Sequence, residues 1–110
     1  MTENQTDASK NLSASISQIK TFSGKLIGND RIHVTVILNP EGNHPNLTIS
    51  LFDHEKNELS RMLIISPQAT DTEFTLHIRR PPQSLPMELI CETFVEDDKI
   101  IEKKTFVIHG

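Results

Sequence analysis

The alternation of apolar and polar residues is the feature that most restricts what this chain can fold into. It is clearest in residues 32–38 and returns in residues 47–51, 74–78 and 87–95. Successive side chains of a β-strand point to opposite faces, so a period of two gathers the apolar ones on one face. The pattern therefore predicts half-buried strands, and it says much more about architecture than about activity.

Polar and turn-forming segments divide the chain into seven predicted strands. Gly28-Asn29-Asp30 is typical turn chemistry, and residues 40–45, 53–58 and 96–99 are polar connections. The strands are expected within residues 14–22 (extended by 25–27), 31–38, 47–52, 59–65, 72–78, 87–95 and 100–108. In the first of them, Ile16, Ile19 and Phe22 follow one another at intervals of three. This spacing also suits a helical turn, and in a strand it calls for a β-bulge.

Short strands separated by turns, with no helical period, indicate an all-β fold. We predict an antiparallel two-sheet sandwich of about seven strands, immunoglobulin-like or fibronectin-III-like. The likeness is architectural, because the chain has one cysteine, no Trp and no Tyr, and so lacks the cysteine pair, core Trp and corner Tyr of true immunoglobulin domains. A small barrel or a jelly roll is the alternative.

The length of 110 residues suits one domain. Residues 1–13 are almost entirely polar and cannot bury enough surface to offset the entropy of ordering, so we expect a disordered N-terminal tail there. Residues 14–110 are then the sandwich domain. The chain can equally be a segment of a larger protein.

Charge and hydrophobicity argue against several classes of partner. Eleven basic residues against 15 acidic ones give a net charge of −4, which disfavours nucleic-acid binding. The sequence has no apolar run long enough to span a bilayer and no signal-peptide pattern at its start. With Cys91 as its only cysteine, the chain is expected to be cytoplasmic, with no nucleic-acid or membrane partner.

No residue pattern indicates catalysis, a metal or a cofactor. Cys91 falls on the inward side of its strand, which suits a buried structural residue better than a nucleophile. The five histidines do not follow a zinc spacing, and the acidic clusters at residues 53–55 and 96–98 stand where hairpins need polar residues. We therefore expect a protein that is not an enzyme and holds neither metal nor cofactor.

Strand phase predicts one apolar surface. If Leu89, Cys91, Thr93 and Val95 point inward, Ile90 and Phe94 point outward. By the same parity, inward residues 47, 49 and 51 leave Phe52 outside, and inward residues 63 and 65 leave Met62 and Ile64 outside. In an immunoglobulin-like sandwich these strands share one sheet.

An apolar patch of this kind usually marks an interface. The leading hypothesis is a protein-interaction module that binds another protein, or a second copy, through Phe52, Met62, Ile64, Ile90 and Phe94, with Arg61 at the rim. The tail or the Pro-rich loop covering that face, or a shift of register, is the alternative explanation. Two other hypotheses are a small-ligand or anion-binding pocket at one end of the sandwich, lined by His44, Arg79 and Arg80, and a structural spacer.

Overall fold

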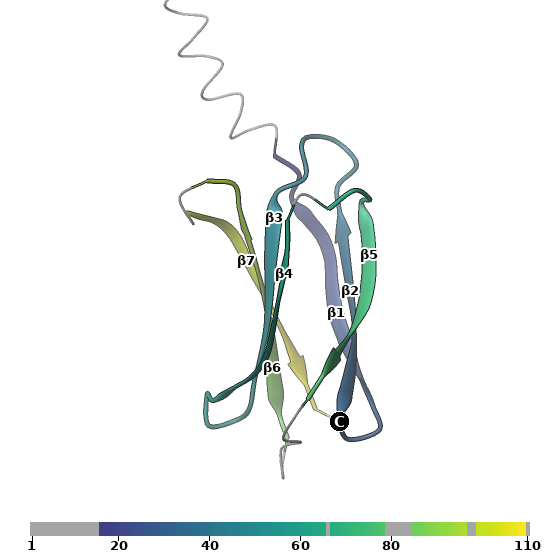
Figure 1. The fold of residues 1–110 in the computed structure, drawn as a ribbon, viewed down its shortest axis with the longest axis vertical. Coiled ribbons are helices and arrows are strands. Elements are labelled where there is room, and N and C mark those ends of the chain that lie inside the picture. Colours follow the sequence, from purple (N-terminus) through teal and green to yellow (C-terminus); the bar gives the residue numbers. More distant parts are fainter. Residues whose placement is uncertain (1–15, 66, 79–84, 97–98, 110) are drawn as a thin grey trace, which may run out of the picture.

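The computed structural model describes residues 16–65, 67–78, 85–96 and 99–109, and these form seven strands in two sheets (Figure 1). No helix occurs within these ranges. The strands are β1 Ile19–Ile27, β2 Arg31–Leu38, β3 Asn46–Phe52, β4 Glu58–Ile64, β5 Asp71–His77, β6 Met87–Phe94 and β7 Ile100–Ile108. The expected tail, residues 1–13, lies outside the described residues, as do Arg79 and Arg80.

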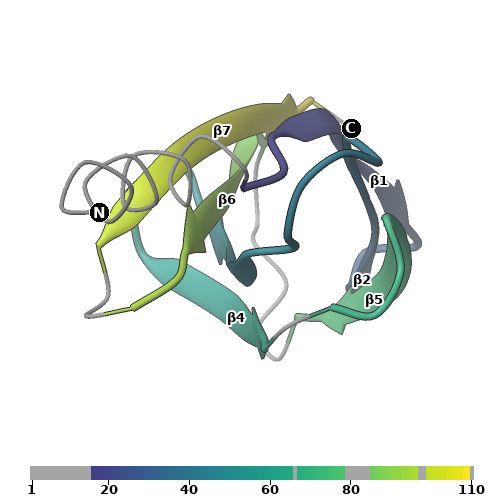
Figure 2. The same cartoon turned by 90° about the horizontal axis from the view of Figure 1, so that it is seen from above.

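The two sheets face each other across one core. One has the order β1-β2-β5 and the other β4-β3-β6-β7, and neighbouring strands are antiparallel throughout. Viewed from above, the sheets form two opposed walls, with β7 beside β1 (Figure 2). The predicted antiparallel two-sheet sandwich is confirmed. The fourth strand pairs with β3 and not with β5, which distinguishes this arrangement from the constant-type immunoglobulin domain.

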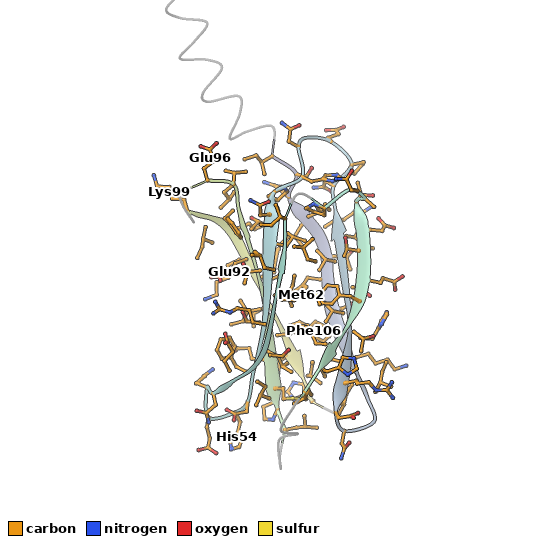
Figure 3. All side chains as sticks on the ribbon, in the orientation of Figure 1. His54, Met62, Glu92, Glu96, Lys99 and Phe106 are labelled. Carbon is orange, nitrogen blue, oxygen red and sulfur yellow. The ribbon has the colours of Figure 1, made fainter. Side chains whose placement is uncertain are left out.

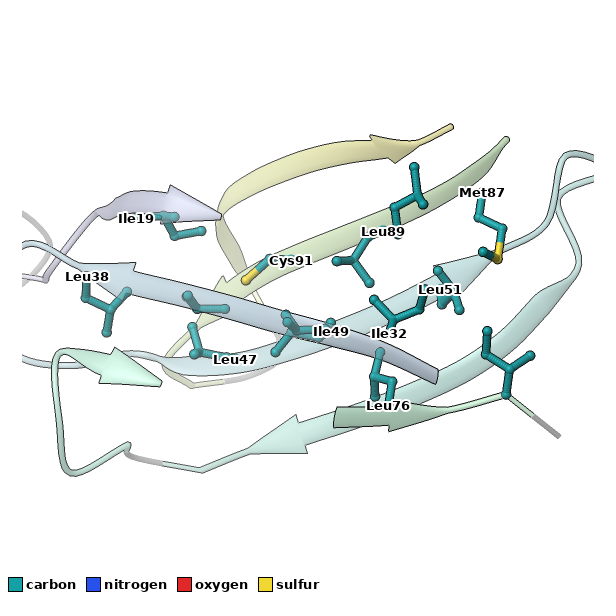
Figure 4. Close-up of a cluster of buried hydrophobic side chains, with 14 residues drawn as sticks. Ile19, Ile32, Leu38, Leu47, Ile49, Leu51, Leu76, Met87, Leu89 and Cys91 are labelled. Carbon is teal, nitrogen blue, oxygen red and sulfur yellow. The ribbon is translucent and has the colours of Figure 1, made fainter. Parts of the chain in front are cut away.

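The central strands have the predicted phase. In β2, β3 and β6 the residues that face the opposite sheet are buried. The opposite sheet covers this face of each strand and leaves the other face toward solvent. Figure 4 shows this core, in which aliphatic side chains from both sheets, together with Cys91, fill the space between them. Its fully buried members include Ile32, Val34, Val36, Leu47, Ile49, Leu51 and Leu89.

The predicted bulge in the first strand is present. Ile19 lies opposite Leu38 and Thr21 lies opposite Ile37, so Lys20 is the additional residue. The bulge returns Phe22 to the inner face, where it packs against the core together with Ile19. The strand itself begins at Ile19, later than expected, since Ser17 is bound instead to the β2–β3 connection through its N–H, which donates to the Asn43 carbonyl at 2.9 Å.

The predicted phase of β4 is wrong. Met62 lies opposite Ile49 and Ile64 lies opposite Leu47, so both point inward and pack against the core. Leu63 and Ile65, expected inside, are 56% and 61% exposed. The four consecutive apolar residues Met62–Ile65 show no alternation of apolar and polar residues. Only the pairing of β4 with β3 therefore determines which of their side chains point to the core. Val95, also expected inside, lies just beyond the end of β6 and is 41% exposed.

Candidate functional site

Three cross-strand rows build the outer face of the four-stranded sheet. In the middle row, Thr48 lies between Leu63 of β4 and Glu92 of β6. The row on one side places Ser50 between Arg61 and Ile90, and the row on the other side places Phe94 between Asn46 and Ile100. Directly opposed residues share a face, so these side chains all stand on the side away from the core.

A shallow hollow of about 340 Å³ lies on this outer face. Its lining combines three apolar side chains with a hydroxyl, a guanidinium and a carboxylate: Leu63, Phe94, Ile100, Thr48, Arg61 and Glu92. Leu63 and Ile100 are each 56% exposed, whereas Phe94 is half-buried. The surface therefore offers an apolar centre with polar groups around it, the composition of binding sites that bury apolar groups of a partner.

Both signs of charge border the hollow. On β4, the Arg61 guanidinium donates to Glu58 Oε1 from Nε at 3.0 Å and approaches it from Nη2 at 2.9 Å. On β6, Glu92 lies opposite Lys103 of β7 in the sheet register. The rim is thus mixed in charge, which favours a partner surface that is itself mixed over a strongly acidic or basic one.

The structure brings together only part of the predicted interface. Arg61 and Phe94 line the hollow, and Ile90 stands on the same face in the row of Arg61 but does not line the hollow. Phe52 is also on this face, but six residues from Asn46 along β3, which places it about 20 Å from the Phe94 row. Met62 and Ile64 are corrections, because they face the core; Figure 3 shows Met62 between the sheets and Glu92 on the outer side.

Four residues of the hollow were not among the predicted site residues: Thr48, Leu63, Glu92 and Ile100. The alternation along β3 and β6 already predicts that Thr48 and Glu92 point outward, so the sequence pattern was enough to include them in the site. Leu63 was missed because β4 lacks alternation. Ile100 was missed because the register between β6 and β7 shifts at Phe94, which the sequence does not reveal.

Cys91 has the character of a structural residue. Its side chain is fully buried in the core, and burial, followed by the charges of Glu102 and Glu92, raises the pKa of the thiol to about 12. A thiol of this kind is not deprotonated near neutral pH and does not act as a nucleophile. Within the described residues, no group of three or more His, Cys, Asp or Glu side chains is placed to hold a metal ion.

The predicted loop-end pocket depends on Arg79 and Arg80, which lie outside the described residues, so only the surroundings of its third member, His44, are described. His44 is bound at the end of the sandwich where β2 finishes, its Nδ1 lying 2.7 Å from the Pro67 carbonyl oxygen. His77 and Ile78, which precede Arg79, lie at the opposite end: His77 faces Arg31 at the start of β2, and the Ile78 N–H donates to the Asp30 carbonyl.

The described residues contain no helix with the length and apolar character that crossing a membrane requires.

Comparison with known proteins identifies the fold but not a family. No family model matches the sequence, and no curated protein matches it. Among solved structures, the chain is similar to two crystal structures of glycosyl hydrolase family 2 members from Bacteroides cellulosilyticus, each with a TM-score of 0.59. The identities are 18% and 16%, over 84% and 86% of this chain. The chain spans only 15% and 14% of those proteins, so it resembles one β-sandwich portion of a much longer chain.

Proposed function

We propose that this chain is a non-enzymatic β-sandwich module that binds another protein through the outer face of its four-stranded sheet. The observation that carries the proposal is the apolar group around one hollow, in which Leu63 and Ile100 are exposed and Phe94 is half-buried. Full burial of such a side chain is worth about 1.5–3 kcal/mol relative to full exposure, so a partner that covers the three gains a substantial part of its binding energy there. The polar rim then orients that partner.

The structural neighbours support an accessory role. Their similarity to this chain is confined to about a seventh of their length, which is what one building block of a multidomain protein displays. Such blocks commonly act by packing against other domains or subunits. The single, fully buried cysteine supports a reducing compartment, the cytoplasm, as the place where the module works.

The test replaces two residues of the hollow separately, Phe94→Glu and Ile100→Glu. Each places a carboxylate in the apolar centre, so a captured protein partner is expected to bind at least about tenfold more weakly, as measured by titration calorimetry. Ile100 is the more exposed of the two and is the variant least expected to disturb folding, which urea denaturation verifies.

The matched control is Ile27→Glu. Ile27 is exposed on β1, in the other sheet, so the same chemical change there leaves partner affinity unaltered. Retention of full affinity by both hollow variants, with the fold intact, contradicts the proposal. Equal loss of affinity in the control points instead to net charge as the determinant.

A further inference from the structure

Of the four sheet edges in the described fold, three are protected against pairing with another strand. β1 and β7 lie against each other, and the Ile19 N–H donates to Glu102 Oε1 at 2.8 Å (Figure 2). β7 also exposes Lys103 and Lys104, and β5 exposes Asp71, Glu73 and His77. Charged side chains and a covering neighbour are the usual means of keeping an edge from pairing.

The fourth edge, β4, has less of this protection within the described residues, since its contact with β5 is smaller than the contact between β1 and β7. Its charges are Glu58 and Arg61, which neutralise each other at 2.9 Å, and it contains neither Lys nor Pro. The apolar run Met62–Ile65 follows them. Leu63 exposes more than half of its surface on the outer side of the sheet, and Ile65, in the bend that follows β4, is equally exposed. Met62 and Ile64 point at the core yet remain half-buried.

We propose that the β4 edge pairs antiparallel with the β4 edge of a second copy of this chain, joining the two four-stranded sheets into one. This interaction is distinct from the partner binding proposed above, because it uses the edge of the sheet. Leu63 belongs to both the edge and the hollow, whereas Ile65 does not line the hollow. Edge pairing supplies hydrogen-bonding partners for an edge that, within the described residues, pairs with a strand on its β3 side only, and it covers the half-buried residues of β4.

A second copy fits because β4 is complementary to itself. A two-fold axis near Leu63 places Leu63 opposite Leu63 on the outer side of the joined sheet, with Arg61 of each copy beside the bend at Ile65 of the other. On the inner side, the same axis places Met62 opposite Ile64. The Glu58–Arg61 pairs then stand at the two rims, so no like charges meet at the centre.

The first test measures self-association of the full chain by sedimentation equilibrium between about 1 μM and 1 mM, the range expected for a small interface. The wild type is expected to dimerise within it. Leu63→Lys and Ile65→Lys, both at exposed positions, raise the dimer dissociation constant by about tenfold or more. The matched control, Ile100→Lys, changes a side chain as exposed as Leu63 but located on β7, and leaves dimerisation unchanged.

A second test uses the axis itself. Opposed residues of an antiparallel pair have Cα atoms about 4.5–5.5 Å apart, a separation that a disulfide spans. Leu63→Cys, treated with oxidised glutathione, is therefore expected to give a covalent dimer, whereas Ile100→Cys is not. The native Cys91 is fully buried and does not interfere.

A wild type that stays monomeric up to about 1 mM overturns the edge proposal and leaves the partner-binding face untouched. The edge proposal is also overturned if Ile100→Lys weakens the dimer and Ile65→Lys does not. That result would mean that two copies associate through the hollow. Loss of partner binding in Phe94→Glu or Ile100→Glu does not test the edge proposal, because neither residue is on β4. The edge is tested by Ile65→Lys, since Ile65 does not line the hollow.

Discussion

At the scale of single residues, the core is almost wholly apolar, and its exceptions are informative. Thr93 is 1% exposed on the inner face of β6, and within the described residues its hydroxyl oxygen finds no hydrogen-bond partner. A buried polar group without a partner has lost its hydrogen bonds to water and forms no hydrogen bond within the protein to replace them. The hydroxyl therefore lowers the stability of the fold.

Thr93→Val is accordingly expected to raise the free energy of unfolding by about 1 kcal/mol, because it replaces the hydroxyl by a methyl group of similar size. Urea denaturation measures the change. Thr105→Val, at an exposed position of β7, is the control and is expected to alter stability by less than about 0.5 kcal/mol. A loss of stability in Thr93→Val would show that the hydroxyl is hydrogen-bonded in solution.

Gly24 shows how tightly the two sheets approach each other at β1. A Cβ atom at this position would lie 2.7 Å from Leu89 Cδ2 and 3.2 Å from Ile32 Cγ2. Both neighbours are fully buried, so neither side chain moves aside without displacing others. The absence of a side chain at residue 24 is thus a condition for the close packing of β1 on β6.

Gly24→Ala is expected to lower the free energy of unfolding by about 1–3 kcal/mol through overpacking. Combining it with Leu89→Val, which removes part of the obstructing side chain, is expected to cost less than the sum of the two single changes. Urea denaturation of the four proteins in this double-mutant cycle measures the coupling. Strict additivity would mean that the strand shifts to accommodate the methyl group.

At the scale of elements, the β3–β4 turn is organised by Asp53. Its carboxylate accepts hydrogen bonds from the N–H groups of Asn57 at 2.8 Å and Glu55 at 2.9 Å, and from the Asn57 side chain. The backbone N–H of Asn57 is the largest cause that holds the pKa of Asp53 below its ordinary value of 3.8. The turn also contains Lys56 at a φ of 70°, a conformation that the bonds around it must maintain.

A lowered pKa in the fold means that the ionised carboxylate stabilises the fold above pH 3.8 and that this contribution fades as the pH falls through the lower, folded-state pKa. Wild type is therefore expected to be more stable than Asp53→Asn at pH 7, and the difference is expected to shrink at about pH 2.5. Urea denaturation of both proteins at the two pH values tests this. A difference that is independent of pH would show that the carboxylate charge is not involved.

The position and inward side of a strand were predictable from the sequence where one face is buried and the other is exposed to solvent. β2, β3 and β6 alternate clearly, and the sequence located each of them and its inward side correctly. β4 is different because it is an edge strand with apolar residues on both sides. The position of β4 was predicted correctly, but its inward side was not. The predicted site therefore omitted Leu63 and wrongly included Met62 and Ile64.

At the scale of the whole molecule, strand order decides which surfaces exist. The hollow contains side chains from all four strands of the larger sheet, so it depends on β4 joining β3 and on β7 joining β6. The β4 edge, the least protected of the four within the described residues, has the same origin, because β4 is the last strand of its sheet. Both proposed interactions are thus consequences of topology.

The order of apolar and polar residues alone determined the all-β class, the positions of the seven strands and the inward side of the central ones, because a period of two is a local property of the chain. Register, bulges and strand neighbours were decided only by the tertiary structure. They depend on which distant segments pair, and for β4, where both faces are apolar, pairing with β3 is what sends Met62 to the core and Leu63 to solvent.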